Sequence, residues 1–397
     1  MQNEKPKTEE ISKNTKIFGI ASFLNDLSSE MMFPLLPFFL TNILFAPVIV
    51  IGILEGLGES IASITGLLSG VYSDKIGKRK KLIISGYTLS GVMKGFLFVI
   101  TSWQPAVLIR CIERFGKGIR EAPRDAMIGL SESKETLGRA FGYRKAMDSA
   151  GAIIGPLVAA ILLAYLMQFG IETAYRTIFL VAVIPAVFSV IVLFFIKETA
   201  TGKNGVDAKE IITGVLKTKN FKAILFAGFV FALGQFSNAF FLLKSVDYMD
   251  LIMVPIAYMA YNVTYTIFSL PAGRLADRLG AKTMITIAGI LFLISIGGFA
   301  FFPSVSMIFL MFALLGLFMA IIETAPKLFI IKSVDKTVYA SAIGFYGAVV
   351  GVAALPANLV AGVLWNVTVF GTNGAFVFSI ATTLLSLVIL IVFIKEG

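Results

Sequence analysis

The sequence predicts an all-α integral membrane protein, and three observations carry this prediction. The 397 residues are 57% hydrophobic and 15% charged, whereas soluble domains are about 45–50% apolar and about 25% charged. Apolar stretches of about 20 residues, the length that crosses a bilayer, follow one another along the chain. A loop motif recurs about half a chain away, which indicates a duplicated unit. The length limits the number of spans to about twelve.

Composition also excludes several functions. Histidine is absent and Cys111 is the single cysteine, so the sequence offers no intramolecular disulfide, no Cys/His zinc site and no histidine-bound haem. We therefore expect no metal and no cofactor. The net charge of +10 is explained by bases on the cytoplasmic side of the spans, so we expect no nucleic acid partner. Residues 1–15 are polar and the first apolar run is too long for a cleavable signal peptide.

Apolar length places the spans, with Pro, Gly or charge at their ends. The predicted organisation is a cytoplasmic tail (1–15), a six-helix bundle (16–197), a cytoplasmic linker (198–219) and a second six-helix bundle (220–397). In the linker, Ile211, Ile212, Val215 and Leu216 form one stripe of a short interfacial helix. The predicted spans are 16–44, 47–72, 81–102, 104–127, 138–166, 174–197, 220–244, 250–275, 282–302, 304–331, 337–366 and 371–395.

Lysine and arginine predict the orientation. They gather in one alternate set of connections, at the amino terminus and around residues 75–81, 134–139, 203–219, 282 and 332–336. The other set holds little beyond Arg176 and Lys244. By the positive-inside rule the first set is cytoplasmic. We expect a multi-pass protein of the plasma membrane with both termini in the cytoplasm.

The internal repeat follows the second and the eighth span. Gly70-Val-Tyr-Ser-Asp74-Lys75-Ile-Gly77 and Gly273-Arg-Leu-Ala-Asp277-Arg278-Leu-Gly280 both fit the pattern G-x-x-x-D-[KR]-x-G. A duplicated six-helix unit is the simplest explanation. Parallel repeats of this kind place a substrate cavity between the halves near the bilayer midplane, and rocking of the halves exposes it to each side in turn.

This duplicated loop resembles the signature of the major facilitator superfamily, and the resemblance covers essentially the whole chain. Phe33-Pro-Leu-Leu-Pro37 resembles the paired-proline motif of its drug/proton antiporters. Gly142, Gly151, Gly155 and Pro156 fit the antiporter motif G-x8-G-x3-G-P. The runs 114–125 and 25–30 resemble a bacterial and archaeal branch whose substrates are mostly unassigned. Two departures stand out: Ala159 and Ala160 replace the antiporter motif's final glycines, and Ile112 occupies the fourth-helix arginine position.

The repeated loops are predicted to form a cytoplasmic gate. Asp74 can cap a nearby helix N-terminus, and Gly70 and Gly273 permit close helix approach. The gate closes the cytoplasmic side in one state and opens in the other. The alternative is that the lysines and arginines of these loops only set the orientation of the chain in the membrane. The predicted gate residues are Gly70, Asp74, Lys78, Arg79, Arg144, Asp148, Gly273, Asp277 and Arg278.

Charged residues within the spans are functional candidates because burying them is costly. Asp26 and Glu30 share a face of the first span, and a stripe on the fourth consists of Arg110, Glu113, Arg114 and Lys117. The resemblance places these stripes opposite each other in the cavity, where they would pair. We hypothesise that the carboxylate of Asp26 or Glu30 gives up its proton when it pairs with Arg110 or Arg114, and takes up a proton when that pair separates. A static ion network is the alternative. Glu59 extends the proton path or makes a helix contact.

The second half carries fewer charges at depth, so we expect it to shape the substrate pocket. The chain's 36 phenylalanines and 14 methionines either line a permissive apolar site or serve as core and lipid-facing residues. The antiporter-like glycines let a neighbouring helix approach closely, which ordinary small-residue packing also explains. The predicted pocket residues are Asn25, Gln235, Asn238, Asn262, Glu323 and Asn358.

The sequence therefore predicts a secondary active transporter that works by alternating access, with a small molecule, protons and the lipid bilayer as its partners. We expect a monomer that exports a small organic compound in exchange for protons. One alternative is an importer of an organic anion or metal chelate; another is a transport-inactive sensor or scaffold. Neither G-x-S-x-G nor H-E-x-x-H occurs, so no enzyme is predicted.

Overall fold

The computed structural model describes residues 10–133, 136–198, 219–302, 304–334, 339–365 and 371–393. Within these ranges the chain is helical and contains no strand. The expected interfacial helix over 211–216 and the bases Lys134, Lys203, Lys209, Lys217 and Lys336 lie outside the described residues.

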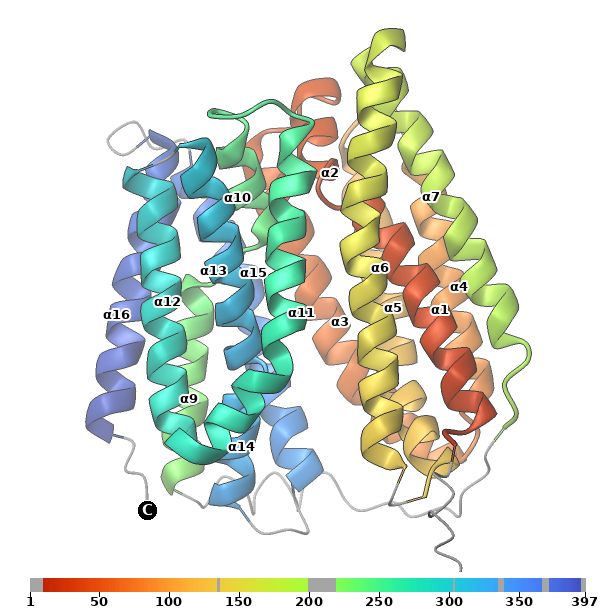
Figure 1. Cartoon of the computed structure of the whole chain (residues 1–397), viewed down its shortest axis with the longest axis vertical. Helices are drawn as coiled ribbons and strands as arrows, with labels where there is room; N and C mark the ends of the chain where they lie inside the picture. Colours follow the sequence, from red (N-terminus) through yellow and green to blue (C-terminus); the bar gives the residue numbers. More distant parts are fainter. Residues whose placement is uncertain are drawn as a thin grey trace, which may run out of the picture.

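The helices form two bundles that stand side by side (Figure 1). The first bundle contains α1 (Lys13–Met32), α2 (Leu36–Phe38), a π-helical turn (Phe39–Ile43), α3 (Val48–Ile76), α4 (Lys80–Phe96), α5 (Gln104–Ser131), α6 (Leu137–Leu166) and α7 (Ile171–Leu193). The second contains α9 (Lys219–Gly234), α10 (Asn238–Ser245), α11 (Met253–Leu279), α12 (Ala281–Phe301), α13 (Val305–Ile322), α14 (Ala325–Ser333), α15 (Tyr339–Leu364) and α16 (Gly374–Phe393).

Each predicted span has a helical counterpart, but three spans are interrupted rather than continuous. The first span breaks after Met32, where Pro34 supplies no backbone donor. The seventh breaks between α9 and α10, and the Ser237 side chain accepts a hydrogen bond from Ala239 N to start α10. The tenth breaks between α13 and α14, with a proline in the first turn of α14. Such interruptions free backbone polar groups near a cavity.

The described helices fit a membrane protein. Eight helical spans are long and apolar enough to cross a bilayer, if α9 with α10 and α13 with α14 are each counted as one span. Neither α1 nor α5 is among the eight, because both carry several charged side chains. Nevertheless, α5 is a single helix over its whole length, including its charged second half and Pro123.

The two bundles are closed at one end and separated by a cavity toward the other. We call the end at which α1 begins and α16 ends the basic end (Figure 1, bottom). At the opposite end, α2 and α10 come together in an apolar cluster that both bundles share. Phe38, Phe39 and Leu40 are buried there with Phe236 and Phe240.

Small residues bring the bundles together along α3 and α15. A Cβ on Gly56 would lie 2.9 Å from Leu355 Cα, and one on Gly362 would lie 2.8 Å from Ile49 Cα. One turn beyond Gly56, toward the basic end, Ser60 Oγ donates a 3.0 Å hydrogen bond to the Gly351 carbonyl. Close backbone approach through small residues is the usual basis of helix packing in membranes.

Each repeated loop ends its helix at the basic end with a glycine of positive φ, but ψ differs between the two, at 10° for Gly77 and 150° for Gly280. Gly77 ends α3 with φ of 64°, and Gly280 ends α11 with φ of 85°. Both values lie in the left-handed region that glycine adopts without strain. The last glycine of the repeat therefore serves to end a helix in both halves.

Two predictions about these loops are corrected. Asp74 does not cap a helix N-terminus; it forms a 2.7 Å ion pair with Arg79. Glu198 caps α4 instead, because its carboxylate accepts hydrogen bonds from the N–H groups of Arg79 and Lys80. A Cβ on Gly70 would lie 3.3 Å from Ala122 Cβ, whereas a Cβ on Gly273 would meet no described residue within 4 Å, so among the residues described the first repeat alone makes a close contact at this glycine.

Candidate functional site

A polar cavity of about 570 Å³ lies between the bundles. It extends from Met32 and Leu36, where the first span is interrupted, to Arg124 and Lys327 near the basic end. Most of its lining comes from α1, α5 and α6 of the first bundle. Its nine positively charged side chains are Lys94, Arg110, Arg114, Lys117, Arg120, Arg124, Arg144, Lys145 and Lys327. Its seven negatively charged side chains are Asp26, Glu30, Glu113, Glu121, Asp125, Asp148 and Glu323.

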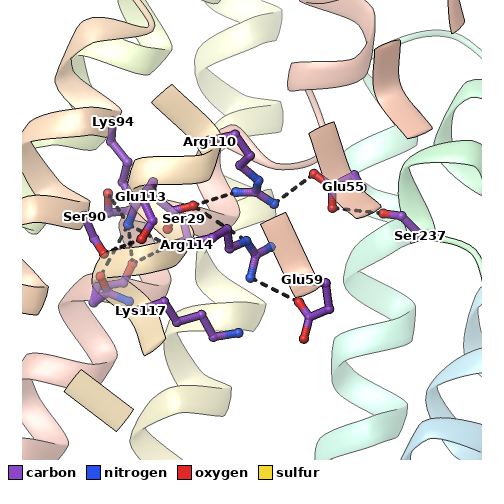
Figure 2. A network of polar contacts seen from close by, with 12 residues as sticks. Ser29, Glu55, Glu59, Ser90, Lys94, Arg110, Glu113, Arg114, Lys117 and Ser237 are labelled. Carbon is purple, nitrogen blue, oxygen red and sulfur yellow. Dashed lines mark hydrogen bonds and ion pairs between the residues drawn. The ribbon is translucent and has the colours of Figure 1, made fainter. Parts of the chain in front are cut away.

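An ionic network joins α5 to α3 at the wall of this cavity (Figure 2). Arg110 Nη2 lies 2.9 Å from Glu55 Oε1, and Arg110 Nη1 lies 3.1 Å from Glu113 Oε2. Arg114 lies 3.6 Å from both Glu113 and Glu59. Glu113 is 6% exposed, so it holds two arginines together in a buried setting. Such pairing offsets the cost of burying charge.

The structure corrects the predicted pairing between α1 and α5. Asp26 and Glu30 line the same cavity as Arg110 and Arg114, but the ion partners of both arginines are Glu55, Glu59 and Glu113. The physical reason is that α3 lies directly against α5. Asp26 accepts a 3.1 Å hydrogen bond from Asn25. Glu30 Oε2 is buried without a hydrogen-bond partner among the described residues.

Lys94 of α4 is held by uncharged groups of α1. Its Nζ donates to Ser29 Oγ at 2.7 Å and lies 3.3 Å from Asn25 Oδ1. The side chain is buried and lines the cavity. Lys94 therefore brings a positive charge from α4 against α1, the helix that carries Asp26 and Glu30. It forms no ion pair with either carboxylate.

The antiporter-like glycines of α6 pack unequally. A Cβ on Gly151 would lie 2.5 Å from the Phe23 carbonyl, and one on Gly155 would lie 2.7 Å from Glu30 Cβ. A Cβ on Gly142 would meet nothing within 4 Å in the part of the chain that the structure describes, contrary to the expectation that this glycine also permits close approach. Pro156 lies within the uninterrupted α6. Close packing at Gly151 and Gly155 fixes α1 against α6 beside its two carboxylates.

Two groups of charged residues line the cavity closer to the basic end. Arg144 pairs with Asp148 at 2.6 Å, one helical turn apart on α6. Lys145 reaches across to the second bundle, where it lies 3.7 Å from Glu323 and donates to the Tyr265 hydroxyl, which donates in turn to Glu323. This contact joins α6 to α11 and to the break before α14. Of the other predicted gate residues, Asp277 and Arg278 are exposed on α11, and Lys78 lies in the connection between α3 and α4.

A second cavity of about 480 Å³ lies mainly in the second bundle. Phe236, Phe241, Phe292 and Phe318 form its aromatic walls, and Gln235, Asn238 and Asn358 contribute amides. Phe292 stacks on Phe318 at 4.7 Å between ring centroids, and Phe236 stacks on Phe241 at 5.0 Å. Lys117 lines both cavities. The second bundle thus contributes an aromatic surface beside the ionic one.

The predicted pocket residues fall into three groups. Asn25 and Glu323 line the first cavity, and the amides named above line the second. Asn262 is corrected: it lines neither cavity, because its Nδ2 donates a 2.8 Å hydrogen bond to the Ala152 carbonyl and ties α11 to α6. Asn358 Oδ1 accepts from Ser237 N at 2.8 Å.

The network also reaches the interrupted seventh span. Ser237 Oγ donates to Glu55 Oε2 at 3.1 Å across the two bundles, as Figure 2 shows. Because Glu55 also holds Arg110, the N-terminus of α10 is linked to the charges of α5. Discontinuous helices of this kind form ligand and ion sites in transporters.

Several cavity residues were not predicted, although the sequence carried a signal for them. Arg120 and Arg124 continue the stripe that ends at Lys117, at helical spacing on α5. Following the three-to-four spacing further would have found them. On α11, Tyr258, Tyr261 and Tyr265 also follow this spacing, and their rings stack in sequence at 5.4 and 6.4 Å.

Two bundles with an ionic cavity between them define a multi-pass membrane transporter. The chain belongs to the major facilitator superfamily, whose family model matches residues 18–251 and 224–397. An MFS-type transporter of Methanocaldococcus jannaschii is 36% identical over 93% of this chain and 92% of its own length. The multidrug resistance protein MdtH of Photorhabdus laumondii is 30% identical over 40% of this chain and 39% of its own length.

Solved structures share the fold. A mutant form of the nucleoside transporter NupG superposes with a TM-score of 0.80 at 14% identity, covering 96% of this chain and all of that chain. A bacterial homologue of the lysosomal transporter Spinster, described as inward-facing, superposes with a TM-score of 0.72 at 14% identity, over 96% and 94% of the two chains. The superfamily is one of transporters rather than enzymes, and its members bind small molecules within a lipid bilayer.

Proposed function

We propose that this protein is a secondary active transporter that exports a small organic compound in exchange for protons by alternating access. It acts as a monomer in the plasma membrane, with the basic end and both termini in the cytoplasm. The conformation described above then corresponds to a state with its cavity toward the cytoplasm. The positive-inside distribution of lysine and arginine supports this orientation.

The observation that carries the proposal is the position of Glu30. Its carboxylate lies in the cavity wall with one buried oxygen that lacks a hydrogen-bond partner among the described residues. Asp26, one turn away, lines the same cavity, and its one hydrogen bond within the described ranges is to the Asn25 amide. Burial favours the neutral form of a carboxylate, and nearby arginines favour the charged form. A carboxylate near Arg110 and Arg114 but not paired with them is suited to gain and lose a proton.

The coupling then has a definite sequence. A proton enters from outside and neutralises Glu30 or Asp26, which weakens their attraction for the cations of α5. The bundles rock, the cavity opens toward the cytoplasm and the proton leaves. The restored charge attracts the cations again. The static part of the network, Glu113 with its two arginines, keeps α5 charged throughout this cycle.

The test uses sealed inverted vesicles with the interior made acid and a pH-sensitive dye. Addition of compounds from a chemically diverse set identifies those that release protons through the wild-type protein. With such a compound, Asp26→Asn and Glu30→Gln abolish proton release and gradient-driven uptake but retain substrate exchange. The control Asp247→Asn removes a carboxylate whose side chain is 49% exposed and remote from the cavity, and it behaves as wild type. Full gradient-driven uptake by both cavity variants would refute the coupling role.

The direction of transport rests on separate support. The packing of Gly151 and Gly155 on α1 keeps the antiporter-like segment in contact with the proposed proton site, and one relative carries the name of a multidrug resistance protein. Uptake into inverted vesicles that are acid inside supports export. Uptake only into right-side-out vesicles that are acid outside would reverse the assignment.

Import of an organic anion is the second candidate, and one observation favours it. Positive side chains outnumber negative ones in the lining of the first cavity. Arg110 and Arg114 already hold carboxylates of the protein. The remaining cations of α5 would therefore bind the anion, and the same pair of vesicle experiments distinguishes this candidate from export.

A further inference from the structure

Arg120 differs from the other arginines that line the first cavity. Arg110, Arg114, Arg124 and Arg144 each have a carboxylate within 4 Å. Arg120 has no ion pair or hydrogen bond in the described part of the chain, and its Nε and Nη1 are buried without partners. The residue is 4% exposed. Asp26, Glu113 and Glu121 interact with it only at longer range. A buried guanidinium without a direct ion pair or hydrogen bond is costly, so its position at a cavity wall indicates a ligand.

The packing of α4 on α5 fixes where this guanidinium lies. A Cβ on Gly86 would be only 2.8 Å from Arg120 Cβ, so the two helices touch at this point. The Arg120 guanidinium carbon lies 4.2 Å from the centre of the Tyr87 ring. Contact with an aromatic face orients a cation while leaving its N–H groups available for a planar anion.

Lys117 connects this position to the aromatic cavity. It lies one turn before Arg120 on α5 and lines both cavities. Its Nζ is 3.9 Å from Glu121, which is a weak pair in a watery setting. Figure 2 shows its side chain extended beside Arg114 and making no contact with the other residues drawn. An anion held by Lys117 and Arg120 therefore lies at the point where the ionic and aromatic walls meet.

The walls on the other side of Lys117 suit a flat apolar group. Phe236, Phe241, Phe292 and Phe318 line the second cavity, with Tyr261 at its edge toward α11. Aromatic walls of this kind stack on ring systems and exclude water. The volumes of about 570 and 480 Å³ are each sufficient for a small organic molecule.

From this juxtaposition we infer that the substrate is an amphiphilic organic anion, whose carboxylate or comparable acidic group binds Arg120 and Lys117 and whose aromatic part enters the phenylalanine-lined cavity. The inference rests on the proposed function only in taking these cavities as the substrate path. It holds for either direction of transport, and it excludes organic cations as the preferred substrates.

The experiment measures binding to the purified full-length protein by thermal shift, without any ion gradient. The probes are 2-naphthoate, its neutral amide 2-naphthamide, the cation 2-naphthylmethylammonium, and acetate as an anion without a ring. We expect a concentration-dependent rise in melting temperature with 2-naphthoate alone, because bound ligand stabilises the folded state by mass action. Equal stabilisation by the amide or the cation, or none by 2-naphthoate at millimolar concentration, would overturn the inference.

Variants separate the two parts of the site. Arg120→Gln weakens apparent 2-naphthoate affinity about tenfold or more, the range expected for one charge-assisted contact, and Arg120→Lys restores part of it. Phe318→Ala also weakens 2-naphthoate binding, because it removes part of the aromatic wall that would hold the ring. The control Lys222→Gln removes an exposed positive charge from α9 and binds as wild type. If Arg120→Gln is poorly folded, the Arg120→Lys and Phe318→Ala results decide the question.

The outcomes distinguish this inference from the proposed function. Specific 2-naphthoate binding combined with proton-independent transport would retain the anion site and refute proton coupling. Proton-coupled transport with preferential stabilisation by 2-naphthylmethylammonium would retain the proposed function and refute the anion site.

Discussion

Gly155 of α6 lies directly against Glu30 of α1: a Cβ on Gly155 would be 2.7 Å from Glu30 Cβ and 3.0 Å from its carbonyl carbon. Gly155, the last glycine of the antiporter-like pattern, therefore touches Glu30, whose Oε2 has no hydrogen-bond partner among the described residues. A movement of α6 against α1 changes the surroundings of that carboxylate. The antiporter-like segment and the proposed proton site form one structural unit.

Gly155→Ala is expected to destabilise the protein by about 1–3 kcal/mol, because the added methyl group forces α6 away from α1. Proton-coupled transport falls with it, since Glu30 is displaced. Thermal unfolding in detergent and dye-based proton release measure the two effects.

Gly142→Ala is the matched control from the same pattern. A Cβ on Gly142 would meet no atom of the described residues within 4 Å, so its replacement should not destabilise the protein and should stabilise it by up to about 1 kcal/mol, because alanine favours a helix more than glycine does. Similar destabilisation by the two alanine variants would show that the contact of Gly155 with α1 is not the cause, since alanine favours a helix more than glycine does.

Glu113→Gln is expected to cost about 3 kcal/mol or more of stability. The change removes the negative charge that Arg110 and Arg114 share, and breaking a buried ion pair leaves uncompensated charge. The melting temperature in a fixed detergent and salt concentration provides the measurement.

Its comparison variant is Glu121→Gln on the same helix. The Glu121 side chain is 44% exposed and lies 3.9 Å from Lys117, so its removal should cost less than about 1 kcal/mol. Equal losses for Glu113→Gln and Glu121→Gln would mean that the Glu113 network is as well solvated as an exposed pair.

Tyr265→Phe is expected to loosen the two bundles at the basic end. The Tyr265 hydroxyl lies between Lys145 of α6 and Glu323 before α14, and the phenyl ring cannot relay that contact. The distance between spin labels on Tyr72→Cys and Leu275→Cys, in a Cys111→Ser background, should be longer or more broadly distributed with Tyr265→Phe than without it.

Thr266→Val serves as the control for this variant, because the Thr266 hydroxyl bonds to the Asn262 carbonyl of its own helix. Its distance distribution should match the unsubstituted double-labelled protein. An unchanged distribution in Tyr265→Phe would show that the remaining pair of Lys145 with Glu323 suffices to hold the bundles.

Glu132 makes stability depend on pH in the loop after α5. Burial raises the pKa of Glu132, but hydrogen bonds from Thr15, Ser12 and Thr136 outweigh it and hold the pKa below its ordinary value. A lowered pKa in the folded state contributes stability that is present above the ordinary value of about 4.3 and is lost as pH falls through the folded pKa. Melting temperatures between about pH 3 and 7 should therefore show an acid-side loss in the wild type that Glu132→Gln lacks.

At neutral pH, Glu132→Gln is expected to be less stable by about 1 kcal/mol, as for the loss of a helix cap. Glu10→Gln, which removes an exposed partner of Lys16, should leave the melting temperature unchanged. A parallel acid-side loss in Glu132→Gln would assign the pH dependence to other carboxylates.

The charged stripes illustrate how far sequence reasoning reached. Spacing of three and four residues placed Asp26 and Glu30 on one face of α1, and the structure puts both in the cavity wall. The same spacing, followed only as far as Lys117, stopped short of Arg120. The partners of Arg110 were predicted wrongly, because helical periodicity specifies a face and not the neighbouring helix that meets it.

The interrupted spans illustrate the converse limit. Pro34 and the polar Gln235-Phe-Ser237 segment were visible in the sequence, yet an apolar length of about 20 residues favours a continuous helix. Whether such a segment breaks depends on partners for the freed backbone groups. Asn358 on α15 supplies one for Ser237, and α15 follows more than 100 residues later.

Hydropathy, repeat and periodicity are properties of local segments, so the amino-acid sequence specifies the membrane-spanning architecture, the duplication and the charged helix faces. Helix packing adds that Glu113 joins two arginines, that Arg120 has no ion pair or hydrogen bond among the described residues, and that Gly155 rather than Gly142 touches α1. These relationships depend on which helices cross and at what depth, and packing between distant segments sets both.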